Sequence, residues 1–489
     1  MTTVSRYLSA AAMALALSAC AAAGPDYHMP ENAVSNAPSA QGNFVSAQVD
    51  AFAQAPLPDR WWSLYDDARL DDLVEQALTA NADLRTADAN VRKAEAVLRE
   101  ATGARTVSTT VSADGDLERD YSTASAGTNM PGVATYDLGL SLSYPLDLNG
   151  KLKRAIEAST ADRETVEAAR DAVRISVAAA TAKAYADVCG ANYQMATVQK
   201  VITLQQQTLD ATTRLAKGGR GTAFDVSRSR TAVETSRASL PAFVAKRQAS
   251  LYLLATLLGK PPADYPQDVA SCATLPRLKS ALPVGDGAAL IRRRPDIRQA
   301  ERAIAGDTAR IGVATADLYP QISLTGGLIT DGVGENIGKT HSFGFSLGPL
   351  LSWSFPNRPV VKARIAASEA QVAADLGKFD STVLEALRGT ETALETYARD
   401  RDKAEALGRA SASAQVSSTQ ASKLFRFGRS DFLDILSAQG SLASAQVSHA
   451  AAQAALVDDQ IAVFLALGGG WGQAPTAAPD EAPAETQPK

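Results

Sequence analysis

This sequence has few histidines and no excess of positive charge, and each of these absences excludes a class of function. Its 489 residues contain 3 histidines, each isolated, with no spacing that would place two of them on one metal ion. They are His28, His341 and His449. The glycine run 468–470 lacks the lysine of a phosphate-binding loop, and 48 lysines and arginines face 53 acidic residues. We therefore expect no enzyme, no metal, no cofactor and no nucleic-acid partner.

Long apolar runs are missing beyond the first twenty or so residues, and aromatic residues make up only 6% of the chain. A membrane-spanning helix needs about twenty consecutive apolar residues. Any part of the mature chain that enters a membrane would therefore do so as β-strands. Alanine and serine are abundant, which favours long, closely packed helices over a large globular core.

The N-terminal end has the pattern of a secretory signal peptide. Arg6 supplies a positive charge, an apolar run from Leu8 to Leu17 follows, and small residues lead to Cys20. We predict that residues 1–19 are a signal peptide and that Cys20 becomes the lipidated first residue of the mature chain. The alternative is an ordinary signal peptide with a chance cysteine. Ala21, in place of the aspartate that retains such lipoproteins at the inner membrane, predicts anchoring in outer membrane lipid, with the chain extending into the periplasm.

Cys189 and Cys272 are the cysteines that remain once Cys20 is acylated. An even pair in an oxidising compartment predicts a disulfide, and two small buried thiols are the alternative. The segment between them is long, so a bond would contribute roughly 3–5 kcal/mol in the chain-entropy model.

Composition separates both ends of the mature chain from its centre. Residues 20–60 are rich in alanine, proline, asparagine and serine and have no periodicity, which predicts a lipidated, extended tether. Residues 472–489 are mostly proline, alanine and glutamate and are predicted to be a disordered tail. The centre is divided into a first repeat, 61–275, and a second repeat, 276–471.

The repeats are visible as two pairs of matching segments. Residues 81–87 match residues 294–300, and residues 214–226 match residues 423–435 around a shared Gly-Arg. One supersecondary unit is therefore used twice in the chain. Each unit is predicted to contain a helix, two strands and then two long helices.

The strands show a strict alternation of apolar and small polar residues. From Tyr136 to Leu148 the even-numbered residues are apolar, and Phe343 to Phe355 repeats the pattern with aromatics near its ends. A period of two fits the lipid-facing and lumen-facing sides of a transmembrane barrel strand. A soluble, half-buried sheet would give the same alternation.

The helices of each repeat are unusually long. Leu70 to Glu100 is predicted as one helix, and Lys151 to about Lys217 as another that contains no proline and would span roughly 100 Å. Valine and alanine recur along the second at coiled-coil-like spacing. Gly218 and Gly219 end it, and Gly428 marks the same turn in the second repeat.

Short motifs in a fixed order complete the pattern. They are Gly24-Pro25-Asp26-Tyr27, Trp61-Trp62, Leu258-Gly259-Lys260-Pro261, Arg292-Arg293-Arg294-Pro295-Asp296, Pro320-Gln321-Ile322-Ser323 and Ala466-Leu467-Gly468-Gly469-Gly470-Trp471. On a duplicated framework, this series resembles the outer membrane factor family, the TolC-like efflux channels, and in particular their lipoprotein branch, the NodT type. The resemblance runs from Cys20 to about Trp471.

The resemblance implies a mainly α fold with a membrane β-barrel portion. Each chain of a homotrimer would give four strands to a shared barrel and its long helices to a periplasmic α-barrel. Four strands cannot close a barrel alone, and open edges in lipid leave backbone groups without hydrogen bonds. The fold class is therefore a duplicated helix-strand-strand-helix-helix unit in a trimeric α/β-barrel.

The same resemblance implies a passive export duct. The partners would be a periplasmic adaptor protein and an inner-membrane transporter, of the resistance-nodulation-division class, for drugs or other small molecules. One alternative is the duct of a type I protein secretion system. Another, of a different class, is a periplasmic coiled-coil scaffold.

A periplasmic gate is the functional site that the resemblance implies. Asp434 matches the first of two aspartates that narrow the pore in relatives, and Asp225 is its partner in the first repeat. Ser437 occupies the second aspartate position and Gly440 a nearby arginine position, which predicts one acidic ring and a weaker closed state. The alternative is that Asp225 and Asp434 only cap the helices that start after each turn.

Overall fold

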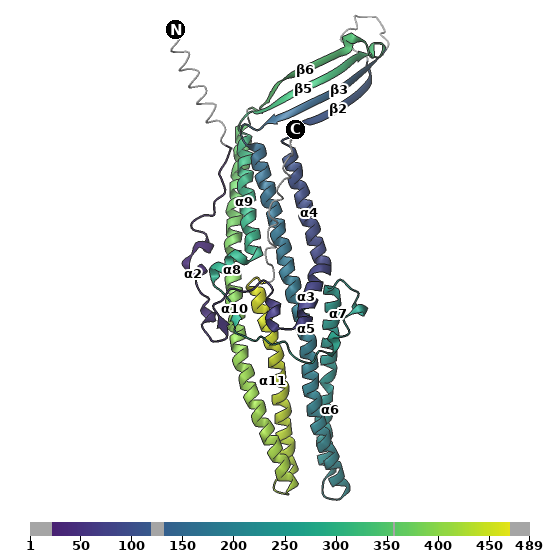
Figure 1. Cartoon of the computed structure of the whole chain (residues 1–489), viewed down its shortest axis with the longest axis vertical. Coiled ribbons are helices and arrows are strands. Elements are labelled where there is room, and N and C mark those ends of the chain that lie inside the picture. Colours follow the sequence, from purple (N-terminus) through teal and green to yellow (C-terminus); the bar gives the residue numbers. More distant parts are fainter. Residues whose placement is uncertain (1–21, 119–131, 356, 470–489) are drawn as a thin grey trace, which may run out of the picture. The chain divides into compact units, whose positions relative to one another are not determined.

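The computed structural model describes residues 22–118, 132–355 and 357–469, which form two compact units (Figure 1). We call them the strand unit and the hairpin unit. The strand unit contains the described residues up to Glu31, with Ala89–Glu167 and Gln299–Phe379. The hairpin unit contains Asn32–Asp88, Ala168–Arg298 and the described residues from Asp380 onward. Each unit contains residues of both repeats.

A four-stranded sheet belongs to the strand unit, and its neighbouring strands are all antiparallel. In sheet order the strands are β2 (Ser108–Glu118), β3 (Val133–Leu146), β5 (Gln321–Val333) and β6 (Phe343–Ser352). The register places Val111, Leu140, Leu328 and Phe345 in one row across the sheet. The adjacent row, which points to the opposite face, is Thr110, Ser141, Gly327 and Ser346. The predicted alternation is thus confirmed, and Phe345 on the apolar face is 86% exposed in the single chain.

Helices make up most of the rest of the chain. They are α2 (Pro38–Gln41), α3 (Ala68–Ala80), α4 (Ala82–Gly103), α5 (Lys151–Lys217), α6 (Ala223–Ala238), α7 (Leu240–Leu257), α8 (Gly287–Arg293), α9 (Pro295–Ala316), α10 (Arg358–Arg426) and α11 (Phe432–Ala466). Short 3-10 helices are η1 (Val34–Asn36), η2 (Val45–Ala47), η3 (Trp61–Tyr65), η4 (Pro262–Asp264), η5 (Val269–Ser271), η6 (Gly334–Asn336) and η7 (Thr340–Ser342). The predicted bounds of the first long helix are confirmed by α5, and α10 is its counterpart with 69 residues.

No helix in the described ranges has both the length and the apolar composition that crossing a membrane requires.

The predicted single helix from Leu70 to Glu100 is wrong, because the chain breaks at Asn81. Its side-chain oxygen accepts hydrogen bonds from the backbone N–H groups of Asp83 and Leu84, at 2.9 and 3.2 Å. Its side-chain nitrogen donates to the carbonyl of Leu257, 3.1 Å away on α7. Asparagine at this position therefore starts α4 as an N-cap and ties the break to a helix distant in sequence.

The described residues 22–60 differ from the expected extended tether. β1 (Phe52–Ala53) pairs in parallel with β4 (Leu282–Pro283). The backbone N–H of Val34 donates to Asp380, at 2.9 Å, and those of Val45 and Ser46 donate to Glu391, at 2.7 and 2.9 Å. The segment lacks periodicity because it is held by α10 side chains rather than by a regular element of its own.

An aromatic cluster forms part of the core of the hairpin unit. Trp61 is fully buried and stacks on Phe464, with 4.7 Å between ring centroids. Tyr65 meets both rings edge-on. Nearby, the Arg294 guanidinium donates to the Ala466 carbonyl at the end of α11, 2.6 Å away, and pairs with Asp296. A cation at a helix C-terminus is favourable because unpaired carbonyls give that end a partial negative charge.

Candidate functional site

The turn between α5 and α6 has the hydrogen bonds of a Schellman motif. The N–H of Arg220 donates to the carbonyl of Leu215, at 2.9 Å, and the N–H of Gly219 to that of Ala216, at 3.1 Å. Gly219 has a φ of 77°, which a residue with a Cβ adopts only under strain. Gly218 lies between Lys217, the last residue of α5, and Gly219. Both predicted turn glycines therefore lie at the end of the helix.

The turn between α10 and α11 repeats this geometry. Arg429 donates to the carbonyl of Leu424 and Gly428 to that of Phe425, each at 2.9 Å. Gly428 has a φ of 67°. The two hairpins of Figure 1 thus end in the same type of turn, each followed by an arginine.

A capping box follows each turn and contains the predicted gate carboxylates. At the start of α6 the N–H of Asp225 donates to the Thr222 hydroxyl, at 3.1 Å, and the N–H of Thr222 donates to Asp225 Oδ2, at 3.2 Å. At the start of α11 the N–H of Asp434 donates to Asp431, at 2.9 Å, and the N–H of Asp431 donates to Asp434 Oδ2, at 3.4 Å. Asp225 and Asp434 therefore cap the starts of α6 and α11, as the alternative interpretation expected.

Capping leaves one oxygen of each of the two carboxylates for another partner. The described residues give Asp225 and Asp434 hydrogen bonds through Oδ2 alone. Asp225 is half-buried, and Asp434 is exposed. A capping role and a role in a charged constriction are therefore compatible.

Asp431 is an acidic residue of this site that sequence reasoning missed. It is the N-cap of α11 and is exposed beside Asp434. The spacing Asp-x-x-Asp before an apolar helix start is the signal that could have found it. Three acidic side chains per chain, from Asp225, Asp431 and Asp434, therefore lie within about a turn of the two helix starts.

Removing the N-cap should loosen the start of α11. We expect Asp431→Ala to destabilise the first turn by about 1 kcal/mol, the usual cost of losing an N-cap side chain. Hydrogen–deuterium exchange of the amides of residues 432–435 should then be several-fold faster. Ser437→Ala, at an exposed position on the same helix, is the control and should leave the rate unchanged. Equal rates in both variants would mean that the cap does not hold this turn.

A groove beside Gly440 lies between α5, α6 and α11. It has a volume of about 340 Å³, and its lining includes Gln205, Arg228, Gln439 and Gly440. The Gln439 side chain donates to the Thr208 hydroxyl, at 2.8 Å. The side-chain oxygens of Gln205 and Gln439 are buried without a hydrogen-bond partner among the described residues. The two hairpins are therefore joined here through polar groups, and two of the glutamine oxygens that meet at the groove have no partner among the described residues.

Exposed aromatic side chains flank the turns. Phe224 is 67% exposed and lies under the Arg228 guanidinium, 5.4 Å from its ring centroid. Phe427 is 80% exposed. Phe425 and Phe432 close the second turn with 6.3 Å between ring centroids. Large exposed apolar side chains next to arginines are typical of surfaces that bind another protein.

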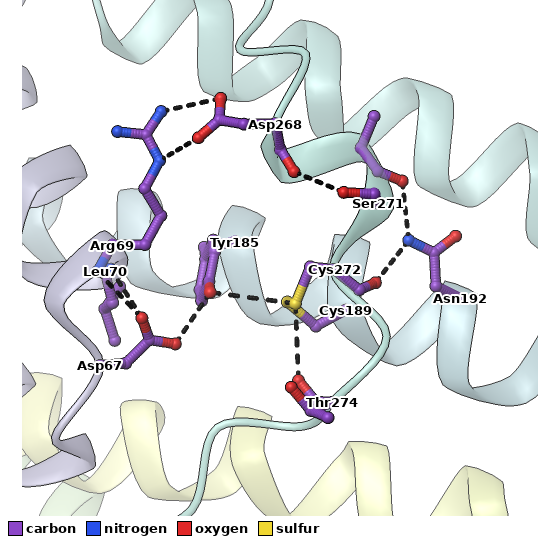
Figure 2. Close-up of a disulfide and its surroundings, with 11 residues drawn as sticks. Asp67, Arg69, Leu70, Tyr185, Cys189, Asn192, Asp268, Ser271, Cys272 and Thr274 are labelled. Atoms are coloured by element: carbon purple, nitrogen blue, oxygen red, sulfur yellow. Dashed lines mark hydrogen bonds and ion pairs between the residues drawn. A yellow bond between two sulfur atoms is a disulfide. The ribbon is translucent and has the colours of Figure 1, made fainter.

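A disulfide joins Cys189 on α5 to Cys272, 83 residues later. The side-chain nitrogen of Asn192 donates to the carbonyls of Ala270 and Cys272, at 3.0 and 2.5 Å, so hydrogen bonds hold the same segment (Figure 2).

Tyr185 extends this connection to α3. Its hydroxyl donates to Asp67, at 2.8 Å, while Asp67 caps α3 by accepting from Arg69 and Leu70 (Figure 2). Arg69 forms an ion pair with Asp268 at 2.6 Å. The disulfide therefore lies in a network that joins α3, α5 and the link between the repeats.

Metal ligands do not cluster in the part of the chain that the structure describes: no group of three histidine, cysteine or acidic residues there could hold an ion. The predicted signal peptide 1–19, the lipidation site Cys20 and the predicted tail 472–489 lie outside the described residues.

Known proteins resemble this chain over nearly its whole length. The family described as outer membrane efflux protein matches residues 73–260 and 288–469. Nodulation protein T of Rhizobium leguminosarum bv. trifolii is 30% identical over 458 residues, 94% of this chain and 96% of that protein. Outer membrane protein OprJ of Pseudomonas aeruginosa is 29% identical over 478 residues, 95% of this chain and 96% of OprJ. A solved structure of the outer-membrane channel OprN superimposes with a TM-score of 0.84 at 33% identity and covers 92% of this chain and 99% of that one.

Proposed function

Because this chain belongs to the outer membrane efflux protein family, we propose that it forms the outer-membrane duct of a tripartite efflux pump. It acts as a passive exit for drugs or other small molecules, and the energy for export comes from elsewhere in the pump. The duct is a homotrimer. Its strand units share one barrel in the outer membrane, and its helices line a tunnel in the periplasm.

The four-stranded sheet is the observation that carries this proposal. One face presents the row of Val111, Leu140, Leu328 and Phe345, and the other presents small and polar side chains. In lipid the first face is covered by acyl chains and the second lines an aqueous lumen. β2 and β6 each have an unpaired edge within the described sheet. Pairing β2 of one chain with β6 of the next satisfies both edges and closes a ring.

The capping-box carboxylates form the gate of this duct. The threefold axis brings copies of Asp225 and Asp434 together, and Asp431 adds further negative charge at the same level. A ring of carboxylates attracts cations and repels anions. The polar groove at Gly440, where Gln205 and Gln439 have side-chain oxygens without a partner among the described residues, supports a closed state that opens readily.

The hairpin turns are where the partners bind. Phe224, Phe427 and the arginines beside them form a surface for the helical tips of a periplasmic adaptor, which connects the duct to an inner-membrane transporter of the resistance-nodulation-division class. At the other end of the mature chain, acylated Cys20 anchors the protein in the outer membrane after removal of residues 1–19. The tail 472–489 has no role in this proposal.

Planar-bilayer recording of the purified protein tests the duct. We expect a trimer by native mass spectrometry and stepwise, cation-selective single-channel currents. A strain that lacks the gene should become sensitive to exported compounds, and the wild-type gene should restore resistance. A monomer without channel activity would overturn the proposal in favour of a periplasmic coiled-coil scaffold.

A further inference from the structure

Charged side chains of the hairpin unit gather on both sides of α11, against α5 and against α10. We call this group the charged cluster, and it consists of Lys183, Asp187, Lys246, Asp400, Lys403, Asp458 and Asp459. Four aspartates are balanced by three lysines. One carboxylate of the cluster therefore has no cation of its own among the described residues.

On the α5 side the charges balance. Asp458 pairs with Lys183, at 3.0 Å, and Lys183 also pairs with Asp187, at 3.2 Å. Lys246, on α7, reaches the other oxygen of Asp187, at 2.7 Å. Tyr65 of the aromatic cluster lies near Asp458, and burial raises its pKa well above the usual value, so it stays neutral. Two lysines thus compensate two carboxylates here, and the excess negative charge lies on the α10 side.

On the α10 side, Asp459 faces another carboxylate. Lys403 forms an ion pair with Asp400, at 3.2 Å. The side-chain nitrogen of Gln460 donates to the hydroxyl of Tyr397, at 3.4 Å, and Tyr397 and Asp400 are three residues apart on one face of α10. The Oδ2 atom of Asp459 is buried without a hydrogen-bond partner among the described residues. An ionised carboxylate at this position is therefore poorly compensated.

A proton supplies what this oxygen lacks. A protonated carboxyl group has one O–H, which Asp459 can donate to the carboxylate of Asp400. A metal ion is a poor alternative, because no group of three histidine, cysteine or acidic residues in the described part of the chain could hold one. Burial, together with the charge of Asp400 and the hydrogen bond to it, raises the pKa of Asp459 to about 6.

We propose that Asp459 and Asp400 form a proton-binding site between α10 and α11, which holds the two helices together while the proton is bound. Loss of the proton replaces a hydrogen bond by two like charges, with Lys403 as the cation beside them. Because the pKa of Asp459 is raised in the folded chain, the contact is tightest below about pH 4, the ordinary value for an aspartate, and weakens as the pH rises through about 6. The hairpin that ends at Gly428 is therefore held more tightly in acidic than in neutral medium. This inference does not depend on the proposed duct.

Infrared difference spectra recorded between about pH 5 and about pH 8 test for the proton. We expect the parent to lose the C=O stretch of a protonated carboxyl group over this range. Asp459→Asn should lack that change, because its amide can still donate to Asp400 but cannot titrate. Burial also raises the pKa of Asp307, which contributes equally to every variant, so the comparison between variants isolates Asp459.

Asp402→Asn is the matched control for both measurements. It removes one negative charge from α10, two residues from Asp400, at an exposed position that pairs with Arg399 at 2.8 Å. Its spectra should match those of the parent.

Hydrogen–deuterium exchange of residues 455–463 tests whether the proton holds α11. After correction for the intrinsic pH dependence of exchange, protection in the parent should be about tenfold higher at the acidic pH, a factor that allows for solvent screening at a partly exposed site. Asp459→Asn should stay protected at both pH values, and Asp402→Asn should follow the parent. Asp400→Asn, with the amide on the opposite helix, should behave like Asp459→Asn and replaces it if that variant does not fold.

Three results would overturn the proposal. The first is a parent without the infrared change, and the second is a parent with equal protection at both pH values. The third is an asparagine variant of either aspartate that keeps the pH dependence of the parent. Because no channel current enters these measurements, failure of the proton site and failure of the duct are seen separately.

Discussion

The double variant Asp225→Asn/Asp434→Asn should lose most of its cation selectivity in planar bilayers. The two aspartates are the capping-box residues behind the hairpin turns, and three copies of each contribute negative charge to the proposed constriction. Asparagine keeps an oxygen that can accept the Thr222 and Asp431 N–H bonds but removes the charge. The permeability ratio of cations to anions should fall several-fold toward that of free diffusion, and block by multivalent cations should weaken in parallel. Trimer stability should change by less than about 1 kcal/mol per helix start.

Glu234→Gln is the matched control for this experiment. It makes the same change of charge on α6, and nine residues from Asp225 place it on the opposite side of that helix. Its selectivity and block should equal those of the parent. If the double variant also behaves like the parent, the two aspartates are helix caps only and the constriction lies elsewhere.

Removing the disulfide should cause the largest loss of stability. For cysteines 83 residues apart the chain-entropy model gives about 4–5 kcal/mol, lost in Cys189→Ala/Cys272→Ala. Because Asn192 still binds the carbonyls of Ala270 and Cys272, the variant should fold to the same structure with a lower thermal midpoint. Differential scanning fluorimetry of the trimer in detergent measures the shift.

Dithiothreitol supplies the control for that measurement. It should lower the midpoint of the parent to that of the double variant and leave the variant unchanged. Peptide mapping without reductant should recover residues 189 and 272 in one linked fragment. Two free thiols in the mature parent would contradict the prediction.

Regular features of the fold could be predicted from the sequence because their physical causes are local. A period of two defined β3 and β6 to within a few residues, and the absence of proline over 67 residues defined α5. The turns could also be placed, because Gly219 and Gly428 supply the positive φ that a Schellman motif needs. Each of these features depends on neighbours within a few positions.

Apart from the pairing of Cys189 with Cys272, features that depend on distant partners could not be predicted. The break at Asn81 needs the Leu257 carbonyl as well as the local cap, and the docking of residues 34–53 needs Asp380 and Glu391. Asp225 and Asp434 were predicted from the family resemblance, whereas Asp431 has no counterpart in that pattern and is recognised by its N-cap geometry. The groove at Gly440 is lined by residues of three different helices, among them Gln205 and Gln439.

The edges of β2 and β6, which have no neighbouring strand in the described sheet, also bear on the rate at which the proposed trimeric channels form. In the described sheet of one folded chain, β2 and β6 each keep an edge without a neighbouring strand, and four strands are too few to close a barrel by themselves. In the proposed homotrimer, these edges are paired only when copies of the chain meet in the membrane. The rate of channel formation should therefore rise steeply with the surface density of newly inserted chains, and sparse expression should leave a long-lived pool of silent subunits.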